Sequence, residues 1–156
     1  MSGICILEDA HLCSVAMLER LCFREPWSEN ALRTLCRPGG LGVVIPDSDR
    51  EGCALAYGGL TYVLDEASVT NIAVHPDHRR AGLGTAVVQA LMQQAAMRGV
   101  QRIYLEVRRA NAAAIALYRT LGFQTVGTRR AFYRFPIEDA LVMQAELSPA
   151  NQNEKD

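Results

Sequence analysis

The sequence predicts an α/β fold in which helices cover a single mixed, mostly antiparallel sheet with a βαβ unit at its centre. Strand-forming residues fill most of the first half, in runs separated by turn residues. A helical pattern over residues 85–98 then lies between two strand-like runs, 67–74 and 103–107. Because no linker or repeat interrupts the chain, we expect one domain over residues 1–147 and a polar, disordered tail over 148–156.

The N-terminal third is expected to hold a short strand, residues 4–7, and two helices. The first helix starts near Asp9, and its apolar stripe consists of Leu12, Val15, Ala16, Leu18 and Leu21. Ser28 is the expected N-cap of the second helix, which ends at Pro38-Gly39-Gly40. Three runs of strand formers then predict an antiparallel meander over residues 41–45, 53–64 and 67–74.

The second half is expected to contain a strand, a short helix and a final pair of strands. Residues 103–107 alternate between aliphatic and polar side chains, so Glu106 should point away from the aliphatic face. Asn111 is a favoured N-cap for the alanine-rich helix over residues 112–118, and Tyr118 shares its helix face. The last two strands are expected at about 124–133 and 140–146.

Composition argues against several classes of protein. The chain has 156 residues, 49% of them hydrophobic, which is enough for a core without disulfides or metals. Its net charge of −1 gives no general positive field for direct nucleic-acid binding. No apolar run approaches the roughly 18 residues needed to span a bilayer, so we expect neither membrane insertion nor export.

The cysteine pattern predicts reduced thiols in a cytoplasmic protein. The five cysteines are widely spaced and form no Cys-x-x-Cys pair. We expect them to be small core residues. They are Cys5, Cys13, Cys22, Cys36 and Cys53.

The most informative segment joins a strand to the central helix. His75-Pro76-Asp77 ends the strand, because proline fixes φ and disfavours helical backbone in the residue before it. Gly82 and Gly84 let the backbone approach a ligand, and the first helical turn adds unpaired N–H groups and a partial positive charge. Arg79 and Arg80 add two full charges. The segment therefore predicts a ligand with phosphate groups, above all a pyrophosphate.

Other interpretations of this segment fit less well. A nucleotide triphosphatase loop needs a lysine and a hydroxyl residue after its last glycine, whereas Gly84 is followed by Thr85-Ala86. A dinucleotide fingerprint would place Glu106 on a ribose, but its third glycine falls at Val87. His75 and His78 lack further ligands in a suitable pattern, so we interpret them as loop residues and expect no metal.

The loop and its surroundings resemble a known family. Arg79 to Gly84 match every defined position of the acyl-coenzyme A motif of the GCN5-related N-acetyltransferases (GNAT), namely Gln or Arg, two residues, Gly, one residue, then Gly or Ala. The likeness continues at Pro26-Trp27-Ser28, residues 105–108, residues 111–118 and Leu121-Gly122-Phe123. Over about residues 4–147 the chain resembles the bacterial members that acetylate the N-terminal alanine of the eighteenth small-subunit ribosomal protein.

The resemblance implies acetyl-coenzyme A (acetyl-CoA) as the cosubstrate. Its pantetheine arm would bond the backbone of Ile72, Ala73 and Val74, and Asn111 would also hold the coenzyme. Its pyrophosphate would lie on the amides of the loop. The loop residues assigned to the coenzyme are Arg79, Arg80, Ala81, Gly82, Leu83, Gly84 and Thr85.

The resemblance also implies the two groups that move protons. An α-amine, with an ordinary pKa of about 8, is mostly protonated at neutral pH and must lose a proton before it attacks a thioester. By likeness Glu106 would be the general base. Tyr118 would be the general acid that protonates the departing sulfur. Neither role needs a covalent acyl-enzyme.

The acceptor is less defined than the chemistry. Related enzymes are expected to carry a Tyr-Tyr pair after the arginines and a longer loop ending in Arg-Glu-Asp-Ala. This chain has Phe132 at the position of the first tyrosine and Ile137 at the position of the arginine, and its loop is shorter. In related N-terminal acetyltransferases this hairpin helps to grip the peptide. Other protein N-termini, lysine side chains, small amines and a non-catalytic acyl-CoA sensor therefore remain alternatives to the ribosomal protein N-terminus.

Overall fold

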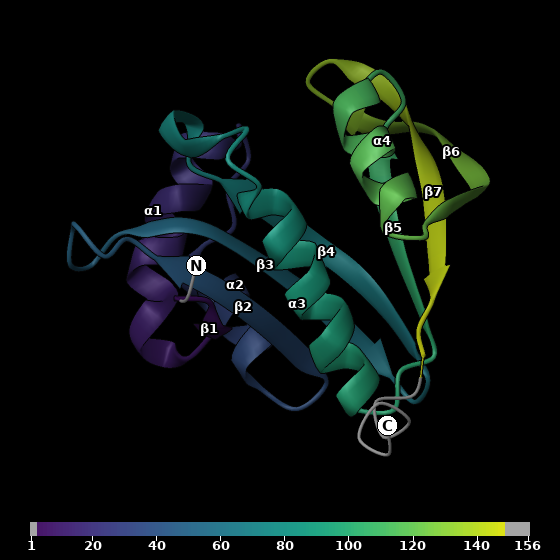
Figure 1. The fold of residues 1–156 in the computed structure, drawn as a ribbon. Helices are drawn as coiled ribbons and strands as arrows, with labels where there is room; N and C mark the ends of the chain where they lie inside the picture. The colour runs from purple at the N-terminus through teal and green to yellow at the C-terminus, as the bar shows by residue number, and fades with distance from the viewer. Residues whose placement is uncertain (1–2, 149–156) are drawn as a thin grey trace.

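Residues 3–148, which the computed structural model describes, form a seven-stranded sheet in the order β1-β2-β3-β4-β5-β7-β6 (Figure 1). Only β4 and β5 pair in parallel, so the predicted mixed, mostly antiparallel sheet is confirmed. The strands are β1 Cys5–Ile6, β2 Gly40–Pro46, β3 Ala54–Val63, β4 Glu66–Val74, β5 Arg102–Arg108, β6 Gln124–Arg134 and β7 Ile137–Glu146. The tail predicted for residues 148–156 lies outside the described residues, apart from Ser148.

Four α-helices and three short 3-10 helices complete the described chain. The α-helices are α1 Leu12–Cys22, α2 Glu29–Arg33, α3 Leu83–Met97 and α4 Ala112–Thr120. The 3-10 helices are η1 Asp9–His11, η2 Thr34–Cys36 and η3 Pro76–His78. None of the helices in residues 3–148 is long and apolar enough to cross a membrane.

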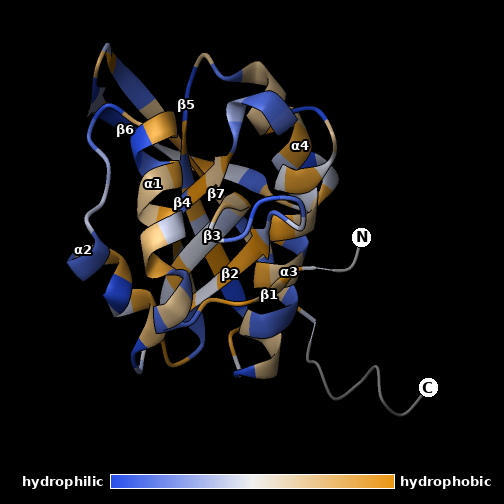
Figure 2. Ribbon diagram, turned by 90° about the vertical axis from the view of Figure 1, so that its left-hand side faces the viewer, coloured by the Kyte–Doolittle hydropathy of each residue, from blue (hydrophilic) through white to orange (hydrophobic). Residues whose placement is uncertain are grey.

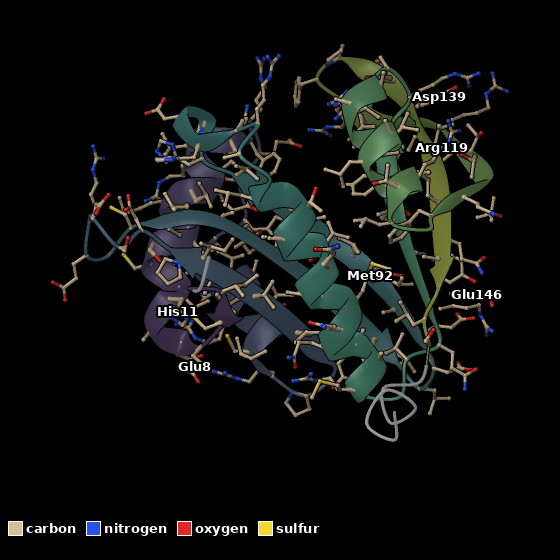
Figure 3. The ribbon with its side chains drawn as sticks, viewed as in Figure 1. Glu8, His11, Met92, Arg119, Asp139 and Glu146 are labelled. Atoms are coloured by element: carbon tan, nitrogen blue, oxygen red, sulfur yellow. The ribbon has the colours of Figure 1, made fainter. Side chains whose placement is uncertain are left out.

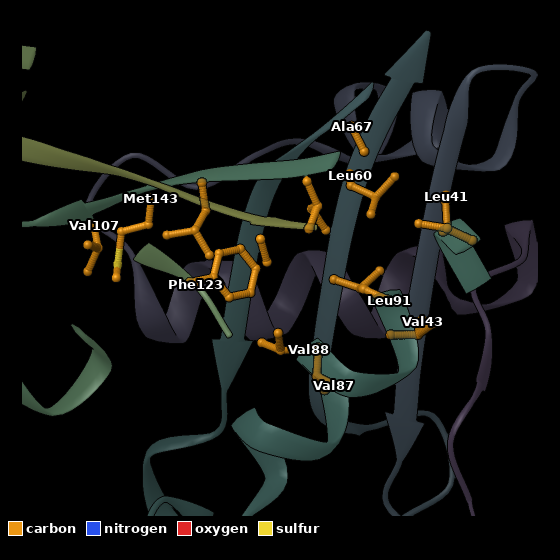
Figure 4. Close-up of a cluster of buried hydrophobic side chains, with 14 of the residues drawn as sticks. Leu41, Val43, Leu60, Ala67, Val87, Val88, Leu91, Val107, Phe123 and Met143 are labelled. Carbon is orange, nitrogen blue, oxygen red and sulfur yellow. The ribbon is translucent and has the colours of Figure 1, made fainter. Parts of the chain in front are cut away.

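Two hydrophobic clusters cover opposite faces of the sheet, because successive side chains of a strand point to opposite sides. Val43 packs with α3, whereas its neighbour Val44 belongs to the cluster of α1 and α2. Figure 4 shows Val87, Val88 and Leu91 of α3 over the strands of the first cluster. In Figure 2 the hydrophobic residues follow the central strands, and hydrophilic residues occupy the loops and outer helix turns.

The sheet opens between β4 and β5. These strands pair only from Glu66–Arg102 to Ser68–Tyr104, after which they diverge (Figure 1). A bulge accompanies the opening, since Gly59 pairs with Asn71 and Leu60 with Val69, which leaves Thr70 unpaired. The rest of β4 therefore keeps one backbone edge that no strand covers.

Most predicted element boundaries are confirmed within two residues, but some side chains lie elsewhere than expected. Leu21 is 58% exposed, because nine residues after Leu12 correspond to about two and a half helical turns and place it on the opposite face. Glu19 occupies the buried stripe instead. The cysteines are not core residues either. Cys5 and Cys13 are exposed, and the other three are only partly buried.

Gly40 is a test of how closely η2 packs on β2. A Cβ at this position would lie 2.8 Å from the Leu35 Cα and still closer to the Thr34 carbonyl oxygen, so backbone would have to move. We expect Gly40→Ala to lower the free energy of unfolding by about 1–3 kcal/mol, measured by urea denaturation. Gly127→Ala is the control, because nothing lies within 4 Å of its Cβ. Equal effects of both substitutions would contradict this close packing.

Candidate active site

The strand-to-helix segment has the backbone shape expected for a phosphate-binding loop. Gly82 has φ 82° in the left-handed region and caps α3, which starts at Leu83 rather than at the predicted Thr85. Arg80 also has a positive φ, 67°, which is unusual for a side chain of this size. The amides of the first turn of α3 have no partner inside the helix. They and the helix dipole therefore favour an anion at this end.

Arg79 of the loop contacts both the end of β4 and the end of α1. Arg79 turns back, and its Nε donates to the Val74 carbonyl oxygen at 3.1 Å. Its terminal nitrogen also lies 3.6 Å from the Cys22 sulfur, which in turn contacts the same carbonyl. Arg79 thus ties the end of β4 to the end of α1, in addition to lining the groove described next.

A groove of about 670 Å³ runs from this loop along the uncovered edge of β4. It brings together all of the predicted coenzyme residues except Ala81, which is exposed beside it. One wall is the end of β4 and the other is α4. The predicted residues in the groove are Ile72, Ala73, Val74, Arg79, Arg80, Gly82, Leu83, Gly84, Thr85 and Asn111.

Next to this groove lies a cleft of about 340 Å³ where β4 and β5 part. Glu106 of β5 and Tyr118 of α4 both line it, and Tyr118 lines the groove as well. The alternation of β5 turns Glu106 away from the buried face, as predicted. Among the residues that line the cleft, Glu106 is the one carboxylate. The Arg129 Nε lies 3.1 Å from its Oε2.

Two phenols face the same cleft in the protonated form. Burial raises the pKa of Tyr118, whose ring packs against Phe123 with centroids 5.7 Å apart. Burial, and next the charge of Glu106, raise the pKa of Tyr133 to about 12. Both hydroxyls can therefore donate a proton or a hydrogen bond at neutral pH.

A second opening of the cleft lies between the α1–α2 loop and the β6–β7 hairpin. Its lining includes Phe23, Trp27, Asn71 and Tyr133. Asn71 was not singled out from the sequence, because an asparagine inside a strand pattern carries no distinctive spacing. The cleft thus has two entrances, one on the groove side and one on this side.

Ion pairs and hydrogen bonds hold the hairpin in place. Arg108 stacks over the Tyr133 ring at 4.3 Å, donates to the carbonyls of Phe135 and Pro136, and pairs with Glu138 at 3.1 Å. Asp139, labelled in Figure 3, accepts a hydrogen bond from the Ala131 amide at 2.8 Å. Arg134 pairs with Glu25 of the α1–α2 loop at 2.8 Å. The hairpin is therefore tied to β5 and to the opposite wall.

The loop histidines have local partners. His75 Nδ1 accepts a hydrogen bond from the Asp77 amide at 3.1 Å, and its ring lies edge-on to His78 with centroids 5.4 Å apart. Within residues 3–148 no group of three His, Cys, Asp or Glu side chains could hold a metal ion.

Comparison with known proteins identifies the family. Residues 12–123 match the model of the acetyltransferase (GNAT) family. The chain belongs to this family. The opening between β4 and β5 and the glycine loop are thus the parts of a GNAT fold that border its groove and cleft.

Individual GNAT relatives match nearly the whole chain. The [ribosomal protein bS18]-alanine N-acetyltransferase of Escherichia coli K12 is 38% identical over 150 residues, or 95% of this chain and 99% of that protein. The N-alpha-acetyltransferase RimI of Mycobacterium tuberculosis is 34% identical, over 88% of this chain and 87% of that protein. The crystal structure of the E. coli ribosomal-protein-S18-alanine N-acetyltransferase has a TM-score of 0.83 at 37% identity, with 93% of each chain covered.

Asn111 is confirmed as the N-cap of α4, and this allows its two assigned roles to be separated. Its side-chain oxygen accepts a hydrogen bond from the Ala114 amide at 3.1 Å. We expect Asn111→Ala to lower the free energy of unfolding by about 1 kcal/mol and Asn111→Ser, which preserves a cap, to change it little. Chemical denaturation measures both. Asn111→Ser then isolates the coenzyme role, and an unchanged coenzyme affinity in this variant would leave the cap as its function.

Proposed function

We propose that this protein transfers the acetyl group of acetyl-CoA to the N-terminal alanine amine of ribosomal protein bS18, with residues 1–147 as its catalytic domain. The similarity to the E. coli bS18 enzyme carries this proposal, since it extends over 95% of the chain and includes the fold. The reaction would take place in the cytoplasm, where ribosomes are assembled. One cleft with two entrances suits a direct transfer between two substrates.

The groove fits acetyl-CoA by its chemistry. Ile72 to Val74 offer an uncovered strand edge, whose backbone N–H and C=O groups can bond the amides of a pantetheine arm. The amides from Arg80 to Thr85 and the guanidinium groups of Arg79 and Arg80 suit a pyrophosphate. When bound, acetyl-CoA supplies a thioester whose acetyl carbon is open to attack by an amine. The proposed thioester position is the cleft between Glu106 and Tyr118.

Glu106 is the proposed general base. It is the carboxylate among the cleft residues and can remove the amine proton directly or through a water molecule. Its Oε2 pairs with the Arg129 Nε at 3.1 Å. Because the Arg129 side chain is 58% exposed, solvent weakens this pair and leaves the carboxylate available to the amine.

Tyr118 is the proposed general acid. It borders both the cleft and the groove proposed for the coenzyme, which supports a role beside the departing sulfur. Its raised pKa keeps the phenol protonated at neutral pH. As the C–S bond breaks, Tyr118 gives its proton to the sulfur. The amine forms the new amide bond, and no enzyme side chain becomes acylated.

The deciding experiment is incubation of the protein with acetyl-CoA and purified, unmodified bS18, followed by mass spectrometry of the digested product. We expect one acetyl group on the α-amine of the N-terminal alanine. A bS18 sample with a chemically blocked N-terminus is the matched control and should gain none. Acetylation of lysines alone would refute the α-amine assignment, and saturable coenzyme binding without transfer to any amine would favour a sensor.

The two proton-transfer roles predict a specific kinetic pattern. We expect Glu106→Gln and Tyr118→Phe each to lower kcat by about 10²–10⁴, because each removes one proton-transfer group and keeps the size of the side chain. Stopped assays of acetyl transfer give the rates, and calorimetry of coenzyme A binding should give nearly unchanged affinities. Turnover close to that of the unsubstituted protein in both variants would contradict the assigned mechanism.

A further inference from the structure

We propose that Glu19 is a positioning residue for the acceptor: its buried carboxylate clamps the α1–α2 loop, residues 23–28, to β4 beside the cleft. This inference rests on the proposed function for the identity of the acceptor. Glu19 lies on α1, is 0% exposed, and lines neither the groove nor the cleft. No step of the proposed chemistry uses it.

The carboxylate of Glu19 joins three parts of the chain through hydrogen bonds. Its Oε1 accepts from the backbone amide of Trp27 at 2.9 Å. Its Oε2 accepts from the Asn71 side-chain amide at 2.8 Å and from the Tyr57 hydroxyl. One side chain therefore connects the α1–α2 loop, β3 and β4.

Burying the Glu19 carboxylate costs free energy. Burial raises the pKa of Glu19, while the hydrogen bonds from Tyr57, Trp27 and Asn71 oppose that shift. The carboxylate stands within a cluster that is otherwise hydrophobic, next to Leu18 and Ala16 on the same helix. An apolar residue would fill this stripe at lower cost, whereas Glu19 accepts hydrogen bonds from the buried Tyr57 and from the half-buried Trp27 and Asn71.

Two of the three donors lie at the second entrance of the cleft, away from the coenzyme groove, and we infer that this is the acceptor entrance. Asn71 lines both the cleft and its second entrance, and Trp27 lines that entrance. The same loop also carries Phe23, which lines the cleft. The Glu19 clamp thus sets the distance between the loop and β4, which form one wall of the acceptor entrance.

The coenzyme groove depends much less on this clamp. It is formed mainly by the end of β4, the glycine loop and α4. The α1 side contributes only Cys22 and Phe23, and neither Trp27 nor Asn71 lines the groove. Loss of the carboxylate should therefore weaken acceptor binding and leave coenzyme binding intact. A residue that only stabilised the fold would change both or neither.

The test compares Glu19→Ala and Glu19→Gln with Val15→Ala. Val15 is fully buried one turn earlier on the same helix face and lines neither the groove nor the cleft, so it controls for lost packing. The acceptor is a synthetic peptide with the N-terminal residues of bS18. We expect Glu19→Ala to raise the acceptor KM about tenfold, as for the loss of a hydrogen bond to a charged group. The Kd of coenzyme A should stay within about twofold.

Glu19→Gln should recover part of the loss, because its amide oxygen can still accept from the Trp27 amide. Val15→Ala should lower the melting temperature without raising the acceptor KM. Hydrogen exchange provides a second readout that does not require turnover. The Trp27 amide should exchange faster in Glu19→Ala than in Val15→Ala.

The outcomes separate this inference from the proposed function. If the unsubstituted protein acetylates no α-amine, the proposed function is wrong, and the exchange of the Trp27 amide still decides the clamp. An unchanged acceptor KM in a folded Glu19→Ala protein would overturn the inference. So would equal Trp27 exchange in Glu19→Ala and Val15→Ala. If Glu19→Ala does not fold, Glu19→Gln carries the same comparison.

Discussion

The early separation of β4 and β5 is the constraint on which the site depends. Their short parallel contact is held at its start, where Asp65 accepts two backbone hydrogen bonds and Arg102 pairs with Glu66 at 3.1 Å. If the pairing continued to Val74, β5 would occupy the backbone edge that borders the groove. The same continuation would close the space between Asn71 and Glu106. An incomplete sheet therefore creates both the groove and the cleft.

The bulge at Thr70 determines which side chains face that opening. An extra residue reverses the alternation of a strand, so it changes the face on which each later side chain lies. Beyond Thr70, Ala73 packs with the α1 cluster, whereas Ile72 packs with the α3 cluster. Asn71 accordingly reaches the buried carboxylate on α1. Local strand geometry thus links the sheet to the helix layer at the second entrance of the cleft.

The sequence predicted the parts of the site that depend on local chemistry. The glycine loop, the Ser28 and Asn111 caps and the alternation around Glu106 follow from neighbouring residues, and the structure confirms them. The sequence pattern was wrong about which of Leu21 and Glu19 is buried. Hydrophobicity favoured Leu21 as the inward residue, but helix geometry turned Glu19 inward instead. Only the tertiary placement of Tyr57, Trp27 and Asn71 supplies the donors that make a buried carboxylate tolerable.

The second entrance of the cleft is held together differently from the groove. The groove borders an uncovered strand edge and a helix start, where backbone N–H and C=O groups are available. The entrance depends on side-chain pairs between distant segments, such as Arg134 with Glu25 and Arg108 with Glu138. Phe132 and Ile137 are exposed on this hairpin, and neither lines the groove. Substitutions in this hairpin can therefore reshape the second entrance without changing the residues that line the groove.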